Sequence, residues 1–173
     1  KTGTLTQNKM TITKLYNGNG FIDISSKTDF PEPFHLVIEY GILASQVNPF
    51  DPMESAITRI GEEYLLNTEH IHIDWVMEKE YPLSKDLLAM SRVFTNTGTN
   101  KKVIAAKGAP EAIFDLCHLK GDTLSQYQKA VAQMASEGLR VLGVAKAGIG
   151  DGDLPPIQHD FEFEFVGLIG LSD

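Results

Sequence analysis

Two segments of the chain carry residue types that suit binding an anionic, phosphate-containing ligand. Segment 107–111 reads Lys-Gly-Ala-Pro-Glu. The lysine supplies a cation, Gly108 allows a ligand to approach the backbone closely, and Pro110 favours the start of a helix whose free amides carry partial positive charge. Arg140 stands in the otherwise apolar segment 138–145, where a guanidinium near the core needs an anion. These residues predict a binding cleft with local positive charge.

Each feature also has a purely structural explanation. Lys107 is compatible with a surface lysine ahead of an ordinary helix, and Arg140 with a structural ion pair to a nearby carboxylate. Segment 1–6, Lys-Thr-Gly-Thr-Leu-Thr, joins a cation, a turn glycine and three hydroxyls that suit a phosphoryl group, but it is equally a solvated polar segment. The residues alone leave both interpretations open.

A helix is expected to begin at Asp51-Pro52. The Asp51 carboxylate can accept hydrogen bonds from the free amides of the first turn, and proline is favoured at the first helical position. Glu54 lies in the same turn. Apolar residues at three-to-four spacing then form a stripe for burial, at Ile57, Ile60, Tyr64 and Leu65, and the helix is expected to end near residue 66.

The rest of the pattern predicts an α+β domain, a mainly antiparallel twisted β-sheet flanked by helical hairpins. Alternating and β-branched residues predict the strands, and capping signals with three-to-four spacing predict the helices. The strands are expected at 10–16, 21–24, 75–81, 87–94, 102–106, 139–147 and 161–171, and further helices at 34–45, 110–117 and from Asp122 or Thr123 to Gly138.

Composition excludes several classes of function. With 15 basic and 23 acidic side chains the net charge is −8, which disfavours nonspecific binding to nucleic acid. Cys117 is the only cysteine, so no internal disulfide forms, and its apolar neighbours indicate a structural role. No apolar run reaches the ~20 residues of a membrane-spanning helix. The histidines lack the spacing of a zinc site, and 151–153 is expected to be a turn, so no metal site is predicted.

The motifs together resemble those of P-type cation-transporting ATPases. Segment 1–6 is similar to everything after the aspartate in the family's Asp-Lys-Thr-Gly-Thr-Leu-Thr motif, and 107–111 to the Lys-Gly-Ala-Pro-Glu motif of its nucleotide-binding domain. Segments 50–57, 138–145 and 165–173 are similar to further parts of that domain and to the strand that returns to the phosphorylation domain. The motif set is closest to the type II pumps.

The resemblance implies a domain organisation and a function. Residues 1–10 and 165–173 would be hinge strands of the phosphorylation domain, and 11–164 the nucleotide-binding domain. The domain would position ATP, with Mg²⁺, so that the γ-phosphate reaches an aspartate that precedes Lys1 and is missing here; Lys1 and Thr2 would assist in the parent. Partners would be the phosphorylation and actuator domains of the same chain. The domain would be cytoplasmic, in an integral membrane protein, and not catalytic in isolation.

The resemblance also assigns a nucleotide site. In the family a glutamate accepts a hydrogen bond from the adenine amino group, a phenylalanine stacks on adenine, and an arginine reaches the phosphates. The implied contacts here are Glu54, Leu83, Ser84, Lys85, Met90, Lys107, Gly108, Ala109 and Arg140.

This sequence departs from the family at two positions, because Leu83 replaces the usual phenylalanine and Leu88 a frequent lysine. Lys85 is then expected to take over some phosphate contact. The alternatives are a helix-dipole role for Glu54 and simple core packing for Leu83 and Met90. For the whole domain, the alternative is a regulatory or protein-interaction module with weak or no ATP binding. A free-standing phosphatase of the haloacid dehalogenase type would need an aspartate pair that the chain lacks.

Overall fold

A computed structural model describes residues 10–24, 31–45, 51–64, 75–149 and 153–173, with the side chains of 61–64 excepted. The predictions for Lys1, Thr2, the rest of segment 1–6, residues 65–66 and most of the 151–153 turn lie outside these ranges.

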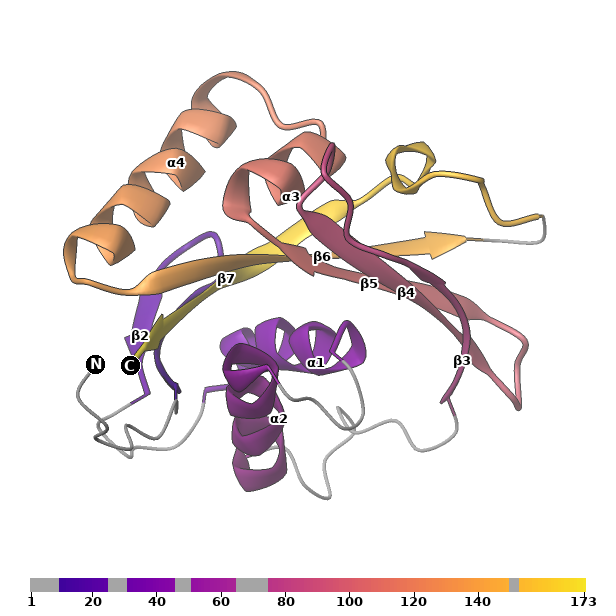
Figure 1. Ribbon diagram of the computed structural model, residues 1–173, viewed down its shortest axis with the longest axis horizontal. Helices are drawn as coiled ribbons and strands as arrows, with labels where there is room; N and C mark the ends of the chain where they lie inside the picture. Colours follow the sequence, from indigo (N-terminus) through magenta and orange to yellow (C-terminus); the bar gives the residue numbers. More distant parts are fainter. Residues whose placement is uncertain (1–9, 25–30, 46–50, 65–74, 150–152) are drawn as a thin grey trace, which may run out of the picture.

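The fold is built on one sheet of seven strands (Figure 1). The strands are β1 (Thr11–Tyr16), β2 (Phe21–Asp23), β3 (Trp75–Tyr81), β4 (Ala89–Asn96), β5 (Lys102–Gly108), β6 (Arg140–Ile149) and β7 (Glu164–Ser172). Their order is β2-β1-β7-β6-β5-β4-β3, and each neighbouring pair is antiparallel. The predicted α+β class with an antiparallel sheet is therefore confirmed.

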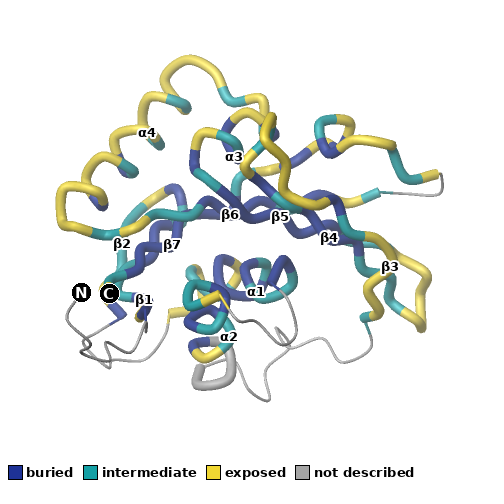
Figure 2. Tube along the Cα trace, in the orientation of Figure 1, coloured by how far each residue is buried: buried dark blue, intermediate teal, exposed yellow. Residues whose placement is uncertain are grey.

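Helices cover both faces of the sheet (Figure 1). On one face lie α1 (His35–Leu43) and α2 (Pro52–Tyr64), and on the other lie α3 (Pro110–Leu116) and α4 (Gly121–Ser136). Two short 3₁₀ turns, η1 (Glu32–Phe34) and η2 (Gln158–Asp160), complete the described elements. Apolar clusters fill the space on each face, so β5 and β7 are mostly buried while α4 exposes its outer side (Figure 2).

Local sequence explains most element ends. The Asp51 carboxylate accepts a hydrogen bond from the Met53 amide at 2.8 Å, so the predicted cap of α2 is present. Gly138 has φ of +83° just after α4, a conformation that favours glycine at a helix C-terminus. The predicted N-terminal cap of α4 is wrong, because the helix begins at Gly121 and its N-cap residue is Lys120, which makes no side-chain capping bond.

The last strand is shorter than predicted. Sequence alternation predicts a strand from residue 161, but β7 begins at Glu164, and Phe161 ends η2. Phe161 and Phe163 are both buried in the cluster beneath α3 and contact each other edge to face, with ring centroids 5.7 Å apart. The alternation therefore reflects burial of the two rings and not strand pairing.

The first and last strands lie side by side. β1 pairs with β7 so that Thr11 is opposite Ser172. The described chain therefore begins and ends at one place on the sheet. Within the described ranges, no helix is both long and apolar enough to cross a membrane.

Candidate functional site

A cavity of about 500 Å³, here called the central cavity, opens where three strands end together. Because β4, β5 and β6 are antiparallel neighbours, the start of β4, the end of β5 and the start of β6 lie at one end of the sheet. The first turn of α2 and the start of α3 complete the wall. The lining residues are Asp51, Met53, Glu54, Leu83, Leu88, Met90, Lys107, Gly108, Ala109, Pro110, Glu111, Arg140, Val141 and Leu142.

A buried ion pair forms part of the wall. Lys107 Nζ lies 3.6 Å from Glu54 Oε2, and the two residues are only 7% and 8% exposed. Burial lowers the pKa of Lys107 below its ordinary value, Glu54 and Asp51 oppose that shift, and Arg92 adds to it. The sequence was compatible with a surface lysine at position 107, but Lys107 is buried. Glu54 is its partner in an ion pair and not only a charge at the start of a helix.

Gly108 is required by packing within the sheet. It pairs with Ala89 of β4. A Cβ atom at position 108 would lie 2.6 Å from Ala89 Cα and closer still to the Leu88 carbonyl oxygen. The Ala109 amide donates a hydrogen bond to that same oxygen at 2.9 Å. The glycine thus lets the β4–β5 junction close, which is a different reason from the ligand approach that the sequence suggested.

Replacing Gly108 with alanine should destabilise the domain by about 1–3 kcal/mol, because the clash is with backbone that cannot rotate away. Gly148→Ala is a matched control, since Gly148 is also a strand glycine but has nothing within 4 Å of the place that a Cβ atom would occupy. Urea unfolding followed by circular dichroism measures both. Equal unfolding free energies for the two variants would contradict the packing explanation.

Arg140 lines the central cavity but is more exposed than the sequence suggested. It is the first residue of β6, it is exposed, and it lines the central cavity. The inference of a guanidinium near the core is therefore wrong. Arg140 stands at the exposed start of β6, and the buried residues of this strand come later in the chain. Among the described residues, no ion pair to Arg140 is present, so the proposed structural ion pair finds no partner there.

Apolar side chains line the cavity together with the charged ones. Leu83 and Leu88 are 58% and 52% exposed, although both line the cavity. Core packing therefore does not explain Leu83. Met90 is half-buried and pairs with Lys107 across the β4–β5 ladder. A ligand with one flat apolar part would cover these side chains.

Two predicted residues are not part of this cavity. Ser84 lines a neighbouring cavity of about 440 Å³ between segment 81–87 and residues 156–159. Lys85 is exposed and lines none of the described cavities. The Ser84 amide donates a hydrogen bond to the Leu87 carbonyl at 3.1 Å, which closes a turn between Leu83 and Leu88.

Sequence reasoning missed Arg92, a buried cation near the cavity. Arg92 is 8% exposed, its Nη2 lies 2.6 Å from Glu80 Oε1, and its Nη1 donates to the Ser45 carbonyl at 3.2 Å. It stands two residues after Met90, so both face the same side of β4. A charged residue inside the apolar strand 87–94 was the available signal.

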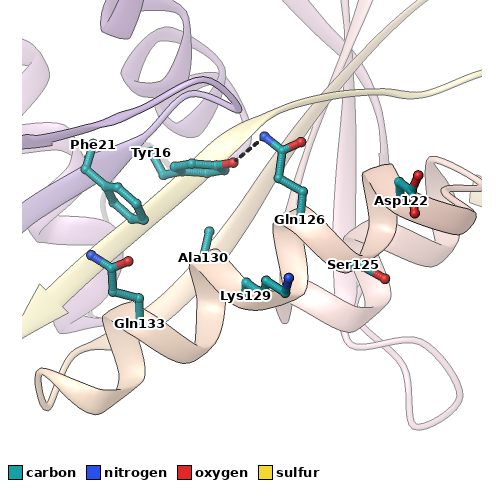
Figure 3. Close-up of a pocket in the computed structure, with 8 residues that line it drawn as sticks. All are labelled: Tyr16, Phe21, Asp122, Ser125, Gln126, Lys129, Ala130 and Gln133. Carbon is teal, nitrogen blue, oxygen red and sulfur yellow. Dashed lines mark hydrogen bonds between the residues drawn. The ribbon is translucent and has the colours of Figure 1, made fainter.

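A separate cavity of about 430 Å³ lies between α4 and the β1–β2 hairpin (Figure 3). Gln126 reaches across it and donates hydrogen bonds to Tyr16 Oη at 3.3 Å and to the Gly18 carbonyl at 3.0 Å. Phe21 packs on Tyr16 with ring centroids 4.8 Å apart. None of the predicted site residues lies there, and its main polar contact joins the hairpin to the helix.

The described residues contain no cluster of histidine, cysteine and acidic side chains suited to hold a metal. Cys117 packs against the cluster beneath α3, and burial raises the pKa of its thiol to about 12. The thiolate, which is the nucleophilic form, is therefore scarce near neutral pH.

Comparison with known proteins agrees with the motifs. The family described as P-type ATPase, cytoplasmic domain N, matches residues 50–173. The whole chain aligns with a calcium-transporting ATPase type 2C member 1 of Bos taurus at 27% identity and with calcium-transporting ATPases of Bacillus cereus and Saccharomyces cerevisiae at 26% and 30%. It spans about a fifth of their length, with 21–22% covered.

The family match confirms two of the expectations drawn from the motifs, the identity of the family and the cytoplasmic location of the domain. Together with the seven-stranded antiparallel sheet and its helices, it shows that this chain belongs to the cytoplasmic N domains of P-type cation-transporting ATPases.

Proposed function

We propose that the domain binds ATP in the central cavity and positions its γ-phosphate for transfer to an aspartate in the neighbouring phosphorylation domain. The observation that carries the proposal is the combination of one apolar wall, one buried ion pair and one exposed arginine around the same space. A nucleotide has a matching division into an apolar base with polar edges and a charged phosphate chain.

The burial of the charged groups supports one orientation of the ligand. Glu54 and Lys107 are buried, so they suit the base, whose amino group donates to a carboxylate and whose ring nitrogens accept from an ammonium. Arg140 is exposed at the same cavity, so it suits the phosphates, which a guanidinium binds through two parallel hydrogen bonds. The base lies inside and the phosphates point out, where a neighbouring domain can reach them.

The pairing of β1 with β7 fits the proposed role in a larger protein. Because Thr11 lies opposite Ser172, β1 and β7 suit a pair of neighbouring strands that joins this domain to another part of the parent protein. The relatives are named as calcium-transporting and are about five times longer, so cation transport belongs to the parent protein in this proposal. Mg²⁺ would arrive with the phosphates, and the described residues contribute positioning alone.

A second candidate function is a protein-interaction module that has lost nucleotide binding. The exposure of Leu83 and Leu88, more than half of each residue, favours it, because an exposed apolar pair suits a protein surface. The two functions differ in whether ATP binds at all. The ATP-binding domain should bind ATP with a Kd near millimolar, which corresponds to a binding free energy of about −4 kcal/mol.

Arg140→Ala should weaken ATP binding about tenfold and leave adenosine binding unchanged, because a charge-assisted hydrogen bond contributes about 1.5 kcal/mol. Isothermal titration calorimetry with both ligands measures this. Lys129→Ala, an exposed lysine on α4 outside the central cavity, is the matched control for net charge. Equal losses for ATP and adenosine would contradict the orientation, and absence of ATP binding by the unaltered chain would favour the interaction module.

A further inference from the structure

Each member of the buried ion pair has a methionine as its neighbour in the chain or across the sheet. Met53 precedes Glu54 in the first turn of α2, and Met90 is the cross-strand partner of Lys107. Both are half-buried and both line the central cavity. The cavity therefore places two oxidisable sulfur atoms next to the groups proposed to hold the base.

The other methionines have different surroundings. Met10 and Met134 are buried in the apolar clusters, and Met77 is exposed on β3, away from the central cavity. An oxidant dissolved in water reaches a thioether only where solvent does. The five methionines of the chain thus divide into two in the cavity, two enclosed by the core and one on the outer surface.

We propose that Met53 and Met90 are reversible oxidation sites through which a peroxide weakens ligand binding in the central cavity. This inference rests on the proposed binding of ATP there. The thioether sulfur attacks one oxygen of hydrogen peroxide, and the S–O bond forms as the O–O bond breaks. The departing hydroxide takes up the proton that the transferred oxygen carried, which leaves one sulfoxide and one water. Each sulfur loses two electrons, and the peroxide is reduced to water.

The chemical change acts on both parts of the binding wall. A sulfoxide is polar and accepts hydrogen bonds, so the apolar surface against which the base would pack becomes a surface that prefers water. At position 90 the new oxygen stands across the ladder from Lys107 and competes with Glu54 for its ammonium protons. Oxidation therefore disturbs the apolar wall and the ion pair at once.

The test exposes the 173-residue chain to a graded dose of hydrogen peroxide, with and without saturating ATP, and follows each methionine-containing peptide by mass spectrometry. Met53 and Met90 should oxidise faster than Met10 and Met134, and ATP should slow the oxidation of the first pair alone. Met77 is the internal control, since its rate should not depend on ATP.

Binding is then measured by calorimetry on the same samples, each compared with its own untreated protein. Oxidation should weaken ATP binding about tenfold, the size expected for one poorly satisfied polar group in the wall, and methionine sulfoxide reductase should restore it. A Met53→Leu/Met90→Leu double variant should lose this peroxide response, whereas Met77→Leu should keep it.

The outcomes separate this inference from the proposed function. ATP binding that survives oxidation of both sulfurs, or oxidation rates that ATP does not change, would overturn the oxidation switch and leave the ATP site standing. Failure of the untreated chain to bind ATP at several millimolar would overturn both proposals.

Discussion

Leu83→Phe should tighten ATP binding about fivefold. Leu83 lines the central cavity with 58% of its surface exposed, so a larger ring there displaces no core packing. Stacking of a base on an aromatic side chain contributes about 1–3 kcal/mol, part of which the leucine already supplies through apolar contact. A net gain of about 1 kcal/mol corresponds to the fivefold change, and isothermal titration calorimetry measures it.

Ile157→Phe is the matched control for this gain. Ile157 is 54% exposed and lines the neighbouring cavity rather than the central one. It should leave ATP affinity unchanged while adding the same aromatic surface. If both variants tighten ATP binding equally, or if Leu83→Phe weakens it, the base does not lie against Leu83.

Lys107→Met should lower the free energy of unfolding by about 3 kcal/mol. The Lys107 ammonium is the cation paired with Glu54, and a buried carboxylate that loses its partner costs about 3–5 kcal/mol. The small remaining exposure of the pair places the expected value at the lower end. The double variant Glu54→Gln/Lys107→Met should recover most of the loss, because neither charge is then buried. Urea unfolding of Lys107→Met, of Glu54→Gln and of the double variant measures the coupling between the two side chains.

The pH dependence of the same pair has a defined sign. Burial lowers the pKa of Lys107 in the folded state, so between that value and the ordinary lysine value the unfolded chain binds more protons than the folded one. The free energy of unfolding contributed by Lys107 therefore rises with pH through this window. The Lys107→Met variant should lack this rise. The rise should therefore remain when the variant's profile of unfolding free energy against pH is subtracted from that of the unaltered chain. Identical profiles would contradict the burial of the ammonium.

Much of the fold follows from local sequence. The strands predicted at 102–106 and 139–147 correspond closely to β5 and β6. The predicted start of α2 at Asp51-Pro52 is also present, because the Asp51 carboxylate accepts a hydrogen bond from the Met53 amide. Phe161 and Phe163 show the limit of that reasoning. Their alternation is real, but tertiary packing beneath α3 uses it without a strand ladder.

Most of the predicted nucleotide contacts line the central cavity, but the sequence did not predict which of them are buried. Motifs placed Glu54, Lys107 and Arg140 together, and the structure sets all three around one cavity. Which of them is buried depends on register and on the docking of α2 against the sheet, which no local pattern encodes. Ser84 and Lys85 were also predicted as nucleotide contacts, but Ser84 lines the neighbouring cavity and Lys85 lines none of the described cavities.

Titration of the ¹⁵N-labelled chain with a non-hydrolysable ATP analogue, followed by amide chemical shifts, tests the central claim most directly. The shifts should concentrate at Glu54, Met90, Gly108 and Arg140, and those at Gln126 and Tyr16 beside the α4 cavity should stay small. Shifts that gather at the α4 cavity, or spectra that do not change at several millimolar analogue, would contradict ATP binding in the central cavity.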